Sequence, residues 1–499
     1  GNVEAIGLAV GDYSYSLLTG NEISLVIKTL DDYAVVDTTD ISTQNPLWLR
    51  EALYYSNKYQ VSQGYSITFA DIGTLTLNTT MSSDGRTINM APTLGEMTIG
   101  GNVTINGLIA TPSAPTWAII NAQDVSRHFF IASGATSTIS TLELHNGHAA
   151  GIGANNNGGS IYVSSDANVT LNDLTIDSSY AAGSGGAIFN AGNLSIISNS
   201  SSFHTWAGQQ FHYLGNVADV AGGVVYNEGS LIVKGADTAH MLDFFGNSAS
   251  SGDGGAIYSR GSAYVYQTRF VFNFASGDGG AVYITNQGDT MFTFTIYDYN
   301  SASGDGGAIY FGNNSGDFDI NAAHFEGNSA SGDGGAVYFG NNSGDLNVRT
   351  NYSYTDPDGY KINSSNNWPT FFEGNSATVN GGAIFMVNSG HLMMDFVRVD
   401  SNSVSNGNGG GIYSYNSGNI TLTDVDMNGN TAMAPNGLGG GIYYANAGVN
   451  GGMVTINTSN ISSNSAGTNG GGIYVNSLGA VVHITNTTLA YNSAMIDGG

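Results

Sequence analysis

Four aspartates recur in one sequence context and are the most regularly spaced reactive side chains of the chain. Asp253, Asp278, Asp305 and Asp333 each lie in an SGDGG segment, four positions before the Ile or Val of an Ala-Ile/Val-Tyr segment. If successive copies stack as strands, the carboxylates form a column with a spacing of about 4.8 Å. Like charges this close repel unless they are hydrated or bridged by a cation, so the column is a candidate Ca²⁺ site. Turn chemistry alone also explains Asp-Gly here and is the favoured explanation.

Catalytic chemistry has less support. A polysaccharide lyase needs a basic proton acceptor beside Ca²⁺-binding carboxylates, and a glycosidase needs two facing carboxylates at a defined separation. The basic residues, among them Lys234, Arg260 and Arg269, recur at no fixed spacing, and no carboxylate pair is singled out. We therefore predict no enzyme and no catalytic or cofactor-binding residue. A polysaccharide lyase or hydrolase is kept as the alternative from a different functional class.

Two insertions interrupt the regular spacing. One covers residues 198–213 and holds His204, Trp206 and His212. A metal site at the two histidines is disfavoured, because no carboxylate or further histidine accompanies them. The second insertion covers residues 350–371, and insertions of this kind form protruding loops, often on the binding face. Its mixture of side chains suits a glycan or protein contact, with a self-packed loop as the alternative; the candidate binding residues are Tyr354, Asp356, Asp358, Tyr360, Lys361 and Trp368.

These residues belong to a tandem repeat that sets the fold. An apolar anchor two positions after each Gly pair recurs, mostly every 25 to 32 residues. A polar motif residue, usually Asn, lies nine to twelve positions before most anchors, with an aromatic or aliphatic residue three positions earlier. The anchors are Ile161, Ile188, Val225, Ile257, Val282, Ile309, Val337, Ile384, Ile412, Ile442 and Ile473.

Each repeat predicts one coil of a solenoid. Apolar residues alternate with polar ones, as in residues 420–425, which indicates strands, and no repeat contains a helical pattern of ten or more residues. A unit of about 28 residues accommodates three short strands, and stacked units bury the apolar face that one unit exposes. We therefore predict an all-β, right-handed parallel β-helix with three strands per coil and an N-terminal cap.

Stacking places equivalent residues in columns. The motif asparagines are predicted to form a buried amide ladder, and the Tyr after each anchor an outward aromatic column. The ladder residues are Asn247, Asn273, Asn300, Asn328, Asn375, Asn402, Asn430, Asn464 and Asn492.

Composition limits the partners. The net charge is −27 with only eleven Lys and Arg, so no basic stripe for nucleic acid exists. Cysteine is absent, which excludes disulfides, thiolate catalysis and Cys-ligated zinc. No apolar run reaches about 18 residues, so no transmembrane helix is predicted. The Ser/Thr/Asn/Gly-rich, Lys-poor composition favours an extracellular or cell-surface location.

The repeats divide the chain into three parts. Residues 1–44 predict strands outside the repeat, and residues 45–145 predict a capping helix at 45–53 followed by degenerate coils; residues 146–499 hold the regular repeats. The final residues contain Asn492 and a Gly pair without the strand that follows elsewhere, so an open last coil is expected. Residues 3–10 are predicted to complete that coil in a neighbouring subunit, giving a head-to-tail filament. The alternative is that the native chain continues past Gly499.

The GGAI and F-x-x-N motifs resemble the repeats of chlamydial polymorphic outer membrane proteins. The opening LREAL, SITF, TLTL and TINM segments resemble a wider group of secreted bacterial and archaeal β-helix surface proteins. The resemblance implies a surface-exposed β-helix, often an adhesin, that contacts a host cell, a neighbouring cell or a glycan. The expected function is therefore structural or adhesive, with a filament subunit and a monomeric adhesin passenger both left open.

Overall fold

The structure is a computed structural model, and it describes most of the chain after residue 94. Described are residues 90, 95–109, 116–151, 156–198, 212–238, 240–285, 289–313, 316–341, 343–350, 369–446 and 452–499, with the backbone of seven further strands. Those strands are β1, β2, β3, β16, β17, β36 and β37. The predicted capping helix at 45–53 and the segment 3–10 lie outside the described residues.

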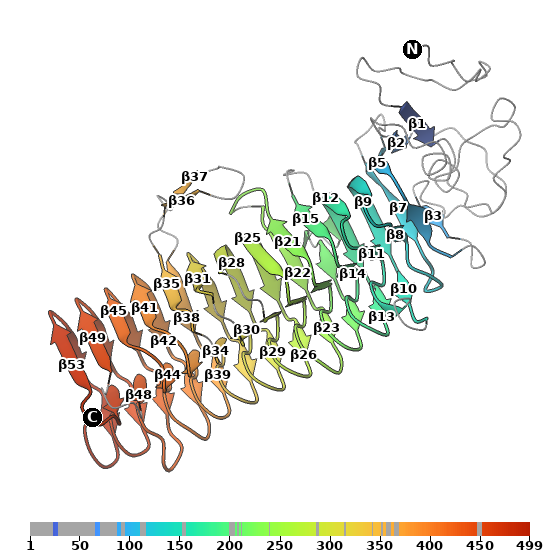
Figure 1. Cartoon of the computed structure of the whole chain (residues 1–499). Helices are drawn as coiled ribbons and strands as arrows, with labels where there is room; N and C mark the ends of the chain where they lie inside the picture. Colours follow the sequence, from blue (N-terminus) through green and yellow to red (C-terminus); the bar gives the residue numbers. More distant parts are fainter. Residues whose placement is uncertain are drawn as a thin grey trace, which may run out of the picture.

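The described chain winds into a parallel β-helix, as predicted (Figure 1). Three sheets run along it, and each regular coil contributes to all three. We name them the Ile-Tyr sheet, the short sheet and the long sheet. The Asn corner joins the long sheet to the short sheet, and the Gly corner joins the short sheet to the Ile-Tyr sheet. No helix occurs in the described ranges.

The Ile-Tyr sheet carries the predicted anchors. They pair coil to coil, for example Ile257 with Val282 and Val282 with Ile309. Its strands are β4 (Met97–Ile99), β8 (Phe129–Ile131), β11 (Ile161–Val163), β14 (Ile188–Asn190), β20 (Val225–Asn227), β24 (Ile257–Ser259), β27 (Val282–Ile284), β30 (Ile309–Gly312), β34 (Val337–Gly340), β40 (Ile384–Val387), β44 (Ile412–Tyr415), β48 (Ile442–Ala445) and β52 (Ile473–Val475).

The short sheet consists of two-residue strands between the two corners. Each strand ends in a small apolar residue, which is buried in every strand except β55; Ala377, Val404 and Ala432 form a cluster apart from the main core. They are β10 (His148–Ala149), β13 (Tyr180–Ala181), β19 (Val217–Ala218), β23 (Ser248–Ala249), β26 (Phe274–Ala275), β29 (Ser301–Ala302), β33 (Ser329–Ala330), β39 (Ser376–Ala377), β43 (Ser403–Val404), β47 (Thr431–Ala432), β51 (Ser465–Ala466) and β55 (Ser493–Ala494).

The long sheet has either one bent strand or two strands per coil. In β25 the bend is at Gln267, which has a positive φ of 48°. The strands are β1 (Ile23–Ile27), β2 (Tyr65–Phe69), β3 (Thr87–Asn89), β5 (Asn102–Asn106), β6 (Leu108–Ile109), β7 (Thr116–Asn121), β9 (Thr136–His145), β12 (Asn168–Asp177), β15 (Asn193–Ile197), β18 (Tyr213–Leu214), β21 (Ser230–Lys234), β22 (Leu242–Phe245), β25 (Ser262–Val271), β28 (Thr290–Asp298), β31 (Phe318–Asn321), β32 (His324–Glu326), β35 (Leu346–Arg349), β38 (Thr370–Glu373), β41 (Leu392–Asp395), β42 (Val397–Asp400), β45 (Ile420–Thr423), β46 (Asp426–Asn428), β49 (Met453–Asn457), β50 (Asn460–Ser462), β53 (Val481–Thr485) and β54 (Thr488–Ala490).

One continuous apolar core fills the solenoid. The residue three positions before the motif Asn points into it, so Phe244, Phe270 and Phe325 are fully buried. Successive rings in this position stack; Phe325 and Phe372, for example, have centroids 4.6 Å apart. The F-x-x-N spacing therefore joins a core ring to the first polar residue of the Asn corner.

Candidate functional sites

The motif asparagines lie in one buried column at the Asn corner. Asn328 donates from its main-chain N and from Nδ2 to Asn375 Oδ1, at 3.0 and 2.9 Å. Its Nδ2 also donates to the carbonyl of Tyr297 at 2.8 Å. Its own Oδ1 accepts the equivalent two bonds from Asn300. The same arrangement repeats along the column, so each amide oxygen from Asn247 to Asn492 receives two donors from the preceding coil.

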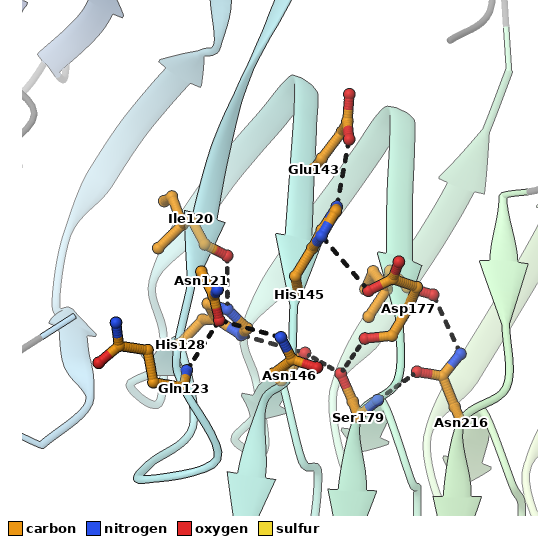
Figure 2. Close-up of polar contacts among 12 residues, drawn as sticks. Ile120, Asn121, Gln123, His128, Glu143, His145, Asn146, Asp177, Ser179 and Asn216 are labelled. Atoms are coloured by element: carbon orange, nitrogen blue, oxygen red, sulfur yellow. Dashed lines mark hydrogen bonds and ion pairs between the residues drawn. The ribbon is translucent and has the colours of Figure 1, made fainter. Parts of the chain in front are cut away.

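The column begins in a network of other polar side chains, shown in Figure 2. Ser179 occupies the Asn position of its coil and donates its main-chain N–H to Asn216 Oδ1 at 3.0 Å. Ser179 Oγ lies 2.7 Å from Ser160 Oγ, which lies 3.1 Å from His128 Nδ1. His128 Nε2 donates to the carbonyl of Ile120 at 2.9 Å. Complete burial lowers the pKa of His128 to about 3, so the ring is neutral and its Nδ1 accepts a hydrogen bond.

The four aspartates stack at the Gly corner. Oδ1 of Asp253, Asp278 and Asp305 each accepts the main-chain N–H of the next aspartate in the column, at 2.7–2.9 Å. Asn380 continues the column by donating from Nδ2 to Asp333 Oδ1 at 3.0 Å. These bonds join residues on successive coils, and among the described residues no group of three or more His, Asp or Glu side chains could hold a metal ion.

Burial makes these carboxylates weaker acids. It raises the pKa of Asp278 to about 6, with a further increase from the neighbouring carboxylates of Asp305 and Asp253. Burial also raises the pKa of Asp305 and of Asp333. The Asp305 main-chain N–H opposes the shift in Asp278 by stabilising its charged form.

The glycine before Asp278, Asp305 and Asp333 is required by the carboxylate of the preceding aspartate in the column. A Cβ on Gly277 would lie 2.1 Å from Asp253 Oδ1, and one on Gly304 would lie 2.0 Å from Asp278 Oδ1. The Gly pair that follows has two separate tasks. Gly254 adopts a φ of 68°, whereas a Cβ on Gly255 would lie 2.0 Å from the carbonyl oxygen of Gly280.

The aromatic column after the anchors is continuous and more buried than an outward column would require. From Phe130 to Tyr474 successive ring centroids are 4.6–5.7 Å apart and nearly parallel. These rings lie outside the main core in clusters of their own. The aspartate column runs beside them, and its charges add to the effect of burial in raising the pKa of Tyr310 and Tyr338.

A cavity of about 700 Å³ near the first regular coils was not anticipated from the sequence. Arg127 lies at its wall with its side chain buried; it pairs with Glu96 and donates from Nε to Gly158 O at 2.8 Å and from Nη2 to Asn157 O at 2.6 Å. Ser126 and His148 also line the cavity. Burial lowers the pKa of Arg127, and pairing with Glu96 opposes this shift. An isolated arginine outside the regular repeats gives no spacing signal, so sequence analysis could not single it out.

A histidine lies between a carboxylate of its own strand and a carboxylate of the next coil (Figure 2). His145 Nε2 is 3.1 Å from Glu143 Oε2, and His145 Nδ1 is 3.6 Å from Asp177 Oδ1. Burial raises the pKa of Asp177; the carboxylate of Glu143 adds to this increase, whereas His145 opposes it. These residues bind one another; Glu143 is buried, whereas His145 and Asp177 are both partly exposed.

Both insertions contain antiparallel hairpins. β36 (Ser353–Thr355) pairs with β37 (Lys361–Asn363), which places Tyr354 and Lys361 on a hairpin that projects from the solenoid in Figure 1. The candidate binding residues Asp356, Asp358, Tyr360 and Trp368 lie outside the described residues. In the first insertion β16 (Thr205–Trp206) pairs with β17 (Gln209–Gln210), and His204 is likewise outside.

His212, at the end of the first insertion, is a buried structural residue. Its Nδ1 accepts the main-chain N–H of Asp243 at 3.2 Å, and burial lowers its pKa to about 4. Across the described residues, no helix is long and apolar enough to cross a membrane.

Comparison with known proteins identifies the repeat. The model of the Chlamydia polymorphic membrane protein repeat matches residues 242–260, 323–340 and 369–386. Each match contains the core ring, the motif Asn and the Gly pair described above. A search of curated proteins gave no significant match.

Two solved structures are weakly similar. One is the periplasmic alginate epimerase AlgG, at 12% identity and a TM-score of 0.35, covering 79% of this chain and 85% of that one. The other is a point mutant of the same epimerase, at 10% identity and a TM-score of 0.30 with the same coverage. Similarity at this level carries no argument about activity. The chain contains Chlamydia polymorphic membrane protein repeats on a parallel β-helix, which fits a surface β-helix protein.

Proposed function

We propose that this chain is an extracellular or cell-surface β-helix protein with a structural or adhesive role. The observation that carries the proposal is the presence of three polymorphic membrane protein repeats within one regular solenoid. The net charge of −27 supports it, since a repulsive, solvated surface keeps an exported rod soluble.

The internal columns support a rigid scaffold. Ladder amides and outer aromatic rings connect successive regular coils, and core rings stack from Tyr213 to Phe372, so bending a coil in that range would disturb three sets of contacts. Such a scaffold can hold projecting segments, such as the β36–β37 hairpin, away from the surface that carries it.

Intact-cell labelling tests the location, and bead adhesion tests the role. An antibody against the solenoid should bind the source cells before permeabilisation, and protein-coated beads should bind host or neighbouring cells above beads coated with an unrelated acidic protein. Labelling only after permeabilisation would refute the surface location. Labelling without adhesion would leave a structural role.

We also propose that the protein is not an enzyme. Purified chain should release no products from acidic or neutral polysaccharides, with or without Ca²⁺. The control is the variant Glu96→Gln, because any true activity in the cavity beside Arg127 should disappear when the Glu96 carboxylate is replaced. Reproducible cleavage that this substitution abolishes would establish the hydrolase or lyase alternative.

A filament is the second candidate, favoured by the exposed apolar side chains of the last described coil. Val482, Ile484 and Leu489 are 42%, 39% and 50% exposed, whereas the equivalent residues of the preceding coil, Val454, Ile456 and Ile461, are buried. A further coil, or the first coils of a second copy, would cover them. Negative-stain microscopy of native material and of a variant lacking residues 1–18 distinguishes the two. Fibres that vanish in the variant support strand exchange, whereas isolated rods in both samples support a monomeric passenger.

A further inference from the structure

One backbone position at the Asn corner carries an aromatic side chain in three coils, Phe272, Tyr299 and Tyr491, where glycine is the commonest residue. The residue directly before the motif Asn has a positive φ in every regular coil, and it is glycine at 215, 246, 327, 374 and 429. In two adjacent coils this position is Phe272 and Tyr299, both with a φ of 54°. A bulky side chain in this conformation is strained. These two rings are also about half exposed, at 54% and 49%.

The two rings form a stacked cluster on the outside of the solenoid. Their centroids are 5.4 Å apart with an interplanar angle of 16°, and Phe245 contacts Phe272 edge-on at 5.6 Å. Tyr299 also donates its hydroxyl to Glu326 Oε1 at 3.0 Å. The cluster therefore shows one ring edge to solvent per coil and ends at Tyr299.

Beyond Tyr299 the next two coils carry glycine at this position. A Cβ on Gly327 would lie 2.5 Å from Tyr299 Cε1, so the Tyr299 ring covers Gly327. No atom lies within 4 Å of the place a Cβ would take on Gly374, so the surface at that glycine is bare. One coil beyond Gly327 there is therefore an opening that no side chain at this position covers.

A row of carboxylates borders this opening. Asp298, Glu326, Glu373 and Asp400 are in register on four successive coils, each one residue before the positive-φ position. Asp400 pairs with Arg398 at 2.7 Å. Glu326 and Glu373 are exposed and make no ion pair within the part of the chain that the structure describes.

We propose that the Tyr299–Glu326–Glu373 surface binds an arginine side chain presented by a partner protein. This inference rests on the proposed surface function and names the partner chemistry for it. A guanidinium stacks flat on an aromatic ring and binds carboxylates through a planar fork of donors. The glycines at 327 and 374 place no further side chain between the ring and the two glutamates, which supply the opposite charge. A second copy of this strongly acidic chain is a poor occupant, because its surface repels this one.

Binding of a fluorescent hexa-arginine peptide to the full chain tests the proposal. The variant Phe272→Gly/Tyr299→Gly restores the residue that five other coils carry and leaves the net charge unchanged. It should weaken binding roughly fivefold, as expected for loss of a ring–cation contact. Its thermal unfolding midpoint should be equal or higher, since the strain is removed. Hexa-lysine should bind more weakly and respond less to this variant.

Charge variants separate this site from general attraction to an acidic protein. Glu326→Gln/Glu373→Gln should weaken hexa-arginine binding by roughly tenfold at physiological salt. The control Asp124→Asn/Asp166→Asn removes two exposed carboxylates from distant turns and should change it less than about twofold.

Three results would overturn the proposal. The first is an unchanged peptide affinity in Phe272→Gly/Tyr299→Gly. The second is a loss of affinity in Asp124→Asn/Asp166→Asn that equals the loss in Glu326→Gln/Glu373→Gln. The third is a change in the sedimentation of the protein itself on glycine substitution, which would identify the patch as a contact between copies of the chain. The peptide assay does not depend on cell location. If intact-cell labelling fails while the peptide results hold, the surface function falls and the arginine site stands.

Discussion

Replacing Asn328 by alanine is the sharpest test of the amide ladder. Asn328 lies in the middle of the column, is fully buried and takes part in five side-chain or ladder hydrogen bonds. The alanine variant keeps the main-chain bond from residue 328 to Asn375 Oδ1. It removes the acceptor of the Asn300 main-chain N–H, one of two acceptors of Asn300 Nδ2, and the amide donor, which binds both Tyr297 O and Asn375 Oδ1.

The expected cost follows from these three losses. A buried N–H without an acceptor costs about 1–3 kcal/mol, and a weakened bond about 0.5–1.5 kcal/mol. We therefore expect the free energy of unfolding to fall by about 2–5 kcal/mol. Asn328→Asp should cost more, because it keeps the acceptor but buries a charge and loses both donors.

Urea unfolding followed by far-ultraviolet circular dichroism measures the change, with Asn406→Ala as the matched control. Asn406 is an exposed turn asparagine, so its replacement should cost less than about 0.5 kcal/mol. Hydrogen exchange should also localise the weakening of Asn328→Ala to the coils of Asn300 and Asn375, because solenoid coils contact only their neighbours. Equal unfolding midpoints for the two alanine variants would refute the ladder as a stabilising element.

Three further predictions concern the corners of the coils. Asp278→Asn introduces the residue that the same column carries at Asn380. Because burial raises the Asp278 pKa to about 6, the variant should be about 1 kcal/mol more stable than the parent at pH 7 and equally stable below pH 4. Equal stability of the two proteins at pH 7 would contradict this. Burial lowers the pKa of His128 to about 3, so the unfolded chain binds a proton below pH 6.5 that the folded protein binds only near pH 3. The free energy of unfolding should therefore fall by up to about 1.4 kcal/mol for each pH unit as the pH is lowered through this window. His128→Asn should remove this pH dependence, which urea unfolding from pH 7 to pH 4 measures. Gly277→Ala should destabilise by about 1–3 kcal/mol through its clash with Asp253 Oδ1, and a double-mutant cycle with Asp253→Ala should show strong coupling.

The sequence alone was sufficient to predict the β-helix and its periodicity. Spacing is visible in the chain because each coil must return the same side chain to the same place; anchors such as Ile257 and Val282, predicted to stack, are paired in the structure. The family resemblance rested on the same motifs, and the repeat model matches at three positions. The outward tyrosine column was predicted as stacked rings, and the structure adds that most are nearly buried.

Features that depend on contacts between coils could be found only in the structure. The sequence does not show that the first Gly of SGDGG makes room for the previous aspartate, because that contact joins residues 24 positions apart, such as Asp253 and Gly277. The Arg127 cavity and the His128 network lie in degenerate coils without a repeat signal. Phe272 and Tyr299 look like ordinary strand residues in the sequence. Only the backbone conformation shows that both occupy a position suited to glycine, and only the stacking of coils brings Glu326 and Glu373 beside them.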